Sequence, residues 1–214
     1  MGPRPRLLSI MTDDDGALWL GSRFEGIFRV SPARMFRAAG YRNAELGSVL
    51  PIIDHPDQGV LVGRLCGGVE HVLDDGRSRP LFEPEAGPTA CTWTMLAEPG
   101  GGVLIASASG RIRRWTNAGT IDIEPGSDDG GHLGANFLFR DRSGTTWLGA
   151  DNGLFRIEDG RIGPAVNEVE ASPLLAAVDA PNDGLLIGTD QGLARFESSE
   201  YRAIRTGEWI DGLS

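Results

Sequence analysis

The sequence has no long hydrophobic run, and this limits what the chain itself does at a membrane. No apolar stretch approaches the roughly 18 residues that a membrane-spanning helix needs. The short apolar run at residues 7–11 is too brief for the core of a signal peptide. We therefore expect no direct membrane insertion by this chain, and any targeting segment of the natural protein lies outside it.

Histidine and cysteine are scarce, with three and two residues. There is no Cys-x-x-Cys pair and no Cys/His cluster with the spacing of metal ligands. His55, His71 and His132 lie far apart in the sequence, and no Ser-His-Asp or Cys-His set shares a local motif. We expect His55 on the surface and His71 in a packing role. The sequence predicts no catalytic residues, no metal and no cofactor.

Basic residues are also few, because 20 Lys and Arg face 30 Asp and Glu for a net charge of −10. Nucleic acids and anionic membranes are bound by basic surfaces. We therefore do not expect nucleic acid as a partner.

Glycine is plentiful, with 31 residues distributed between short apolar runs, and this indicates many turns. An apolar strand that ends in a small residue, followed by a glycine turn and a second strand, occurs five times. The strand-ending residues are Gly21, Gly63, Ala106, Gly149 and Gly188, at intervals of 42, 43, 43 and 39 residues. A near-constant period of this length indicates a repeat architecture.

Each repeat holds about four strands, called A to D below. Several B strands are apolar at consecutive positions, as in 17–20 and 184–187, which suits sheets that are covered on both faces. Four-stranded units packed radially make an all-β fold, the β-propeller, with one blade per repeat. A parallel β-solenoid is the alternative, although its coils are usually shorter. The single domain or fragment spans 1–214, with repeats at 7–47, 48–90, 91–134, 135–172 and 173–204 and a lead-in to a further blade at 205–214.

The repeat position of each small residue predicts what that residue does in the blade. The glycines at 26, 68, 110, 153 and 192 turn strand B into strand C. Those at 21, 63, 149 and 188, with Ala106, allow close packing where the inner strands converge. Cys66 and Cys91 are expected on the same face of the propeller. We favour two unpaired small hydrophobic residues, with a disulfide as the alternative in an exported protein.

The first and fourth copies resemble the two-component regulator propeller repeat. The residues that carry the resemblance are Asp141, Gly144, Trp147, Leu148, Gly149, Gly153, Leu154 and Arg156 in the fourth copy and Asp13, Gly16, Trp19, Gly21, Gly26 and Arg29 in the first. The fifth copy keeps Gly188 and Arg195 but has Leu186 in place of the tryptophan. The second and third copies have Leu61 and Leu104 there.

This resemblance implies an extracytoplasmic sensor domain of a bacterial signalling receptor. In that family the propellers precede a transmembrane helix and an output module such as a histidine kinase or a diguanylate cyclase. They are typically seven-bladed, so five repeats imply a fragment or a truncated open array, with a closed five-bladed ring as the second choice. The implied partners are further blades and an output module, and a fragment with uncovered blade faces is expected to self-associate.

Propellers generally bind ligands on the face that the B–C and D–A loops form around the central channel. The candidate ligand-binding residues on that face are Arg23, Arg64, His132, Asp151, Asn152 and Gln191. Arg23 and Arg64 occupy similar repeat positions and suit an anionic ligand such as an acidic sugar. Alternatively each arginine pairs with a local acid such as Glu25.

The sequence therefore favours a non-enzymatic sensor propeller that binds a small molecule or carbohydrate. Two alternatives stay open: a propeller enzyme, such as a polysaccharide or lactone lyase, and a protein-interaction scaffold. An enzyme needs clustered histidines, acids or metal ligands at the channel mouth, and the three scattered histidines weigh against it.

Overall fold

The computed structural model of this protein consists of β-strands and connecting turns throughout its described part. It describes residues 7–13, 16–23, 26–31, 34–37, 48–55, 59–64, 66–81, 91–107, 109–125, 134–167, 173–180, 184–197 and 200–204. His132, Glu25 and the predicted lead-in at 205–214 lie outside these residues. The chain divides into two compact units, 1–108 with 113–121 and 109–112 with 122–214, and each is described separately below.

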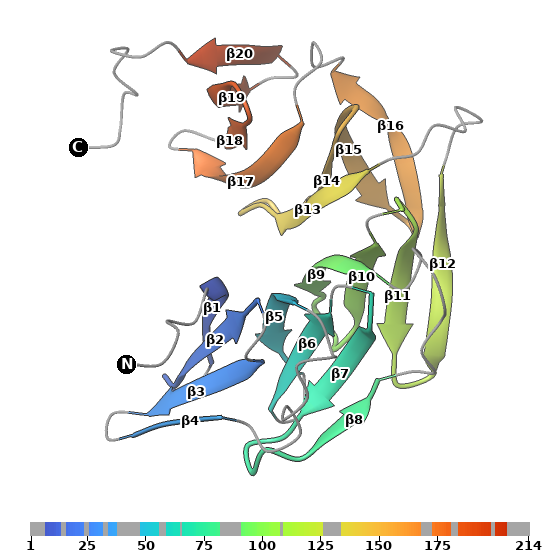
Figure 1. The fold of residues 1–214 in the computed structure, drawn as a ribbon. Coiled ribbons are helices and arrows are strands. Elements are labelled where there is room, and N and C mark those ends of the chain that lie inside the picture. Colours follow the sequence, from blue (N-terminus) through green and yellow to red (C-terminus); the bar gives the residue numbers. More distant parts are fainter. Residues whose placement is uncertain are drawn as a thin grey trace. The chain divides into compact units, whose positions relative to one another are not determined.

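The first unit holds two complete four-stranded antiparallel sheets, each with its strands in sequence order (Figure 1). The first blade consists of β1 (Leu7–Thr12), β2 (Leu18–Ser22), β3 (Ile27–Ser31) and β4 (Arg34–Arg37). The second consists of β5 (Val49–Asp54), β6 (Val60–Arg64), β7 (Gly68–Val72) and β8 (Ser78–Pro80). The third consists of β9 (Thr92–Ala97), β10 (Val103–Ser107), β11 (Ile112–Thr116) and β12 (Gly119–Pro125), and the end of β12 from Asp122 belongs to the second unit.

The second unit holds the fourth and fifth blades, with the same strand order. The fourth consists of β13 (Ala135–Arg140), β14 (Thr146–Ala150), β15 (Gly153–Glu158) and β16 (Arg161–Asn167). The fifth consists of β17 (Leu174–Ala180), β18 (Gly184–Thr189), β19 (Gly192–Glu197) and β20 (Glu200–Ile204). Within this unit the end of β12 pairs in parallel with the start of β16. The prediction of four-stranded blades is confirmed.

The B strands explain why the blades pack face to face. Every residue of β6, β10 and β14 is buried, as expected for strands that are apolar on both sides. In the first unit one core cluster centres on Trp19, Ile27 and Val62, and another on Leu61 and Ile105. In the second unit the cluster contains Phe137, Trp147, Leu174, Ile187 and Phe196.

The predicted roles of the repeat glycines are confirmed with one exception. All five B–C turn glycines have a positive φ, for example +74° at Gly68, which non-glycine residues rarely adopt. A Cβ at Gly21, Gly63 or Gly149 would overlap a neighbouring side chain, so close packing requires glycine there. At Gly188 the nearest atom to such a Cβ is a backbone oxygen 4.0 Å away. The packing prediction is wrong at Gly188, because its facing residue is the small Ala176.

The prediction that the two cysteines are unpaired is also wrong. Cys66, in the turn between β6 and β7, forms a disulfide with Cys91, just before β9. The two residues are 25 positions apart in sequence. Packing of the second blade against the third brings them together, which sequence spacing alone does not reveal.

Candidate functional site

The structure places Arg64, a predicted ligand-binding residue, inside the first unit. Its side chain is only 2 % exposed, and its Nη2 lies 2.6 Å from Oε1 of Glu70. Arg64 ends β6 and Glu70 lies on the neighbouring strand β7. The alternative that Arg64 pairs with a nearby acid is therefore confirmed, and the acid is Glu70. A role of Arg64 in ligand binding stays a prediction.

Arg23 lies at the same end of the first unit as Arg64, but it is exposed. Its carbonyl oxygen accepts a hydrogen bond from Oγ of Ser48 over 3.1 Å. The residue after Ser48, Val49, pairs with Arg64 across β5 and β6. The first and second blades thus present these two arginines from neighbouring backbone segments, one exposed and one buried.

The turn that follows Arg64 is fastened to the third blade at two points. The Cys66–Cys91 disulfide is the first. The second is a buried hydrogen bond of 3.3 Å, from Oγ1 of Thr92 to the carbonyl oxygen of Gly68. These links hold the B–C turn of the second blade against strand β9.

In the second unit, Asp151, Asn152 and Gln191 are exposed at the tips of B–C turns, as predicted. Asp151 accepts a hydrogen bond of 2.8 Å from Nδ2 of Asn136. The backbone N–H of Gln191 donates to Oγ1 of Thr189, which closes the turn between β18 and β19. The structure thus places Arg23 and Arg64 on one unit and these three residues on the other.

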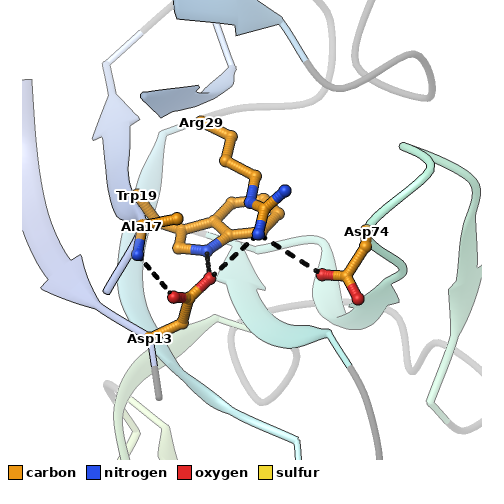
Figure 2. A network of polar contacts seen from close by, with 5 residues as sticks. All are labelled: Asp13, Ala17, Trp19, Arg29 and Asp74. Atoms are coloured by element: carbon orange, nitrogen blue, oxygen red, sulfur yellow. Dashed lines mark hydrogen bonds and ion pairs between the residues drawn. The ribbon is translucent and has the colours of Figure 1, made fainter. Parts of the chain in front are cut away.

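The opposite ends of the blades carry a contact set that we call the Asp–Trp–Arg module. In the first blade, Oδ1 of Asp13 accepts from the backbone N–H of Ala17 and Oδ2 from the indole Nε1–H of Trp19, each over 2.7 Å (Figure 2). The Arg29 guanidinium carbon lies 5.4 Å from the centre of the Trp19 ring. The Nη2 of Arg29 is 3.5 Å from Asp13 and 4.0 Å from Asp74.

The fourth blade repeats the module with Asp141, Trp147 and Arg156. Oδ1 of Asp141 accepts from the backbone N–H of Thr145 over 2.9 Å, and Oδ2 accepts from Nε1–H of Trp147 over 2.7 Å. The Arg156 guanidinium carbon lies 5.0 Å from the centre of the Trp147 ring. The residues that carry the repeat resemblance therefore have defined contacts.

Both module carboxylates are held in the ionised form. Burial by itself would raise the pKa of Asp13, but hydrogen bonds from Trp19 and Ala17 and the charge of Arg29 outweigh it and lower the pKa. The same balance holds for Asp141, where burial is outweighed by hydrogen bonds from Ser143, Trp147 and Thr145, so that its pKa is also lowered. An ionised carboxylate is the stronger acceptor for the indole N–H.

Two of the three blades without the tryptophan place other pairs at corresponding positions. In the third blade, Glu98 receives two hydrogen bonds from Arg114, of 2.7 and 2.9 Å. In the second, the rings of His55 and His71 stack with centres 3.9 Å apart. His71 is 3 % exposed, consistent with its predicted packing role. His55, expected on the surface, is half-buried because of this stack.

The module end of the second unit also carries a cleft of about 510 Å³. The β13–β14 turn and strands β14 and β15 line one side, with Ser143, Trp147 and Arg156. Strands β17 to β19 line the other, with Asp179 and Glu197. This volume falls within the usual range for small-molecule sites. Sequence reasoning missed the cleft, although the joint recurrence of Asp, Trp and Arg in two copies pointed to a contact set at this end.

The described residues contain neither a metal-binding cluster nor a membrane-spanning helix. No group of three or more His, Cys, Asp or Glu side chains in that part of the chain is arranged to hold a metal ion. Within the same residues, no helix is long and apolar enough to cross a membrane.

Comparisons with known proteins identify the fold. No protein-family model matches the sequence, and no curated protein matches it either. Virginiamycin B lyase from Staphylococcus aureus is similar in structure, with 16 % identity and a TM-score of 0.75 over 95 % of this chain and 71 % of the lyase.

Two larger proteins share the same architecture. One is the extracellular domain of a protein described as a hybrid two-component system from B. thetaiotaomicron, with 15 % identity and a TM-score of 0.75 over 92 % of this chain and 28 % of that one. The other is an ancestral GH74 enzyme, with 15 % identity and a TM-score of 0.73 over 95 % of this chain and 31 % of that one. This chain thus spans less than a third of either. At these identities the comparisons show that the chain has the β-propeller fold, which both sensor domains and enzymes use.

Proposed function

We propose that this chain is a non-enzymatic ligand-binding propeller, in the input region of a bacterial two-component or diguanylate-cyclase-type receptor. The observation that carries the proposal is the Asp–Trp–Arg module. The residues of the two-component regulator propeller repeat form the same contacts in the first and fourth blades. The sequence resemblance therefore reflects a shared structural unit.

An extracytoplasmic location fits the same proposal. The Cys66–Cys91 bond supports it, because disulfides persist in oxidising compartments and are rare in the cytosol. Extracellular domains of two-component systems are among the proteins of similar fold. A ligand bound by such a propeller biases an output module through its different affinity for two receptor states.

The gene context tests the receptor part of the proposal. The coding sequence on both sides of this stretch is expected to encode further propeller repeats, a transmembrane helix and an output module. An open reading frame that encodes this chain alone, with none of these elements, would contradict the receptor role.

A lyase is the second candidate, favoured by the fold shared with virginiamycin B lyase. One of the similar structures is that lyase with quinupristin. We expect this chain to return quinupristin unchanged after prolonged incubation, as judged by mass spectrometry. A quinupristin-derived product that forms only in the presence of the chain would overturn the non-enzymatic assignment. A protein-interaction scaffold would bind neither quinupristin nor small carbohydrates.

A further inference from the structure

We propose that the cleft between the fourth and fifth blades binds a sugar acid, a small polyhydroxylated molecule that carries a carboxylate, with Arg156 holding the carboxylate. This inference rests on the proposed function, since it takes the chain to be a ligand-binding module and names a site and a ligand class. The site lies at the module end of the second unit, away from the B–C turn tips that the sequence singles out.

The first step is the charge of Arg156. In the first, third and fifth blades the arginine at the corresponding position of the repeat is paired with at least one acid. The pairs are Arg29 with Asp13 and Asp74, Arg114 with Glu98, and Arg195 with Glu197 at 3.0 Å. Arg156 is exposed, and its guanidinium makes no ion pair or hydrogen bond with the part of the chain that the structure describes. It is therefore a cation available to a ligand.

The second step is that the acids of the cleft already have partners. Asp141 receives hydrogen bonds from Ser143, Thr145 and Trp147. Asp179 accepts a 3.0 Å hydrogen bond from the backbone N–H of Arg142 and lies 3.6 Å from its side chain. Glu197 is paired with Arg195. Asp179 and Glu197 are thus offset by Arg142 and Arg195, whereas Asp141 is held by neutral donors and keeps its charge. Of the two arginines that line the cleft, Arg142 is paired and Arg156 has no ion pair among the described residues, so a carboxylate complements Arg156.

The third step is orientation. Trp147 is held by its hydrogen bond to Asp141 and by an edge-to-face contact with Phe196, with ring centres 5.5 Å apart. Arg156 lies over the indole face, so the contact uses the face of the guanidinium. Its N–H donors lie in the plane of the group and remain available. A planar carboxylate matches this fork with two parallel hydrogen bonds.

The fourth step is the rest of the ligand. Besides Arg156, the residues that line the cleft include the acids Asp179 and Glu197 and the hydroxyl-bearing Ser143 and Thr145. Carboxylates accept hydrogen bonds from ligand hydroxyls but repel a bare anion, and a doubly charged phosphate more than a carboxylate. A molecule with one carboxylate and several hydroxyls satisfies both requirements, and the open cleft of about 510 Å³ accommodates a monosaccharide or disaccharide of this kind.

The test is calorimetric titration of the purified chain with sodium D-glucuronate, alongside glucose, acetate and inorganic phosphate. We expect saturable glucuronate binding, and binding at least about tenfold weaker for the other three, because each lacks either the acid, the hydroxyls or the single charge. Arg156→Gln should weaken glucuronate binding at least about tenfold, and Arg156→Lys should weaken it less, since it keeps the charge and loses the fork.

The matched control is Arg161→Gln, which removes the same charge from an exposed position on β16 outside the cleft. It should bind glucuronate as the parent chain does, with all variants first shown to melt cooperatively. The absence of saturable binding, equal binding by Arg156→Gln, or acetate or phosphate binding as tight as glucuronate would each overturn the assignment. A different ligand found by a wider screen and insensitive to Arg156 would overturn it as well, while leaving the proposed sensor function intact.

Discussion

At the scale of single residues, Asp141 shows how one carboxylate organises the repeat. One oxygen closes the turn between β13 and β14 through the backbone N–H of Thr145, and the other fixes the Trp147 indole. The indole in turn supports Arg156. Sequence comparison between copies identified these residues, but their spacing alone did not show that they contact one another.

Removing this carboxylate should destabilise the fold. In Asp141→Ala the buried indole N–H of Trp147 loses its acceptor and the turn loses a hydrogen bond, which should lower the free energy of unfolding by about 1–3 kcal/mol. Urea titration followed by tryptophan fluorescence measures this. Asp190→Ala, at an exposed turn tip, is the control and should change stability by less than about 0.5 kcal/mol. Equal effects for the two variants would contradict the role given to Asp141.

The lowered pKa values of Asp13 and Asp141 predict acid sensitivity. The folded-state pKa lies below the unfolded value of about 3.9, so ionisation stabilises the folded chain above that pH. The contribution is lost as the pH falls below about 4 towards the folded-state pKa. Urea midpoints between pH 6 and 3 should fall less steeply in the Asp13→Asn and Asp141→Asn double variant. An unchanged slope would count against the two carboxylates as the cause.

At the scale of strands, two glycines at the same repeat position make a matched pair. A Cβ on Gly149 would overlap the ring of Phe137, whereas a Cβ on Gly188 meets nothing closer than 4.0 Å. Gly149→Ala should therefore lower the free energy of unfolding by about 1–3 kcal/mol. Gly188→Ala should be close to neutral, within about 0.5 kcal/mol. Denaturant titration of both variants decides, and a larger loss at position 188 would contradict the packing described.

The Cys66–Cys91 bond fastens the second blade to the third and should contribute to stability. It closes a loop with a sequence separation of 25 residues, for which the chain-entropy relation gives about 3.5 kcal/mol. A reducing agent should lower the melting temperature of the parent chain. The Cys66→Ala and Cys91→Ala double variant should melt at the lower temperature with or without reductant. A parent chain indifferent to reductant would show that the bond contributes little.

At the scale of the whole molecule, each of the two units exposes apolar side chains on the first strand of one of its blades. In the first unit β1 exposes Leu8 and Ile10, at 45 % and 69 %, and in the second β17 exposes Leu175 and Val178, at 51 % and 56 %. Uncovered apolar surface of this kind favours association with a second copy. Light scattering should show a mass that rises with concentration. Ile10→Lys should reduce the rise, whereas Ile121→Lys on β12 should not, and a clean monomer throughout would contradict this expectation.

The sequence predicted the blades well because the repeat of about 42 residues is marked by local features, namely turn glycines and small residues at the ends of the B strands. The turn glycines and the convergence of Gly21, Gly63 and Gly149 on larger side chains follow from residue type and position. The candidate site was less predictable because it depends on contacts between strands and between blades. The partner of Arg64 lies on the next strand, Cys91 belongs to the next blade, and the cleft brings Arg156 to the same pocket as Asp179. None of these contacts recurs at a fixed spacing in the sequence, so the repeat pattern does not reveal them.

The most direct measurement of the central claim, that this propeller binds its ligand through Arg156, is an NMR titration of arginine side-chain N–H groups with sodium D-glucuronate. We predict that the Nε–H signal of Arg156 shifts in a saturable manner while that of Arg29, paired with Asp13 in the first blade, does not. An Arg156 signal that stays in place at high glucuronate concentration, or equal shifts at both arginines, would contradict it.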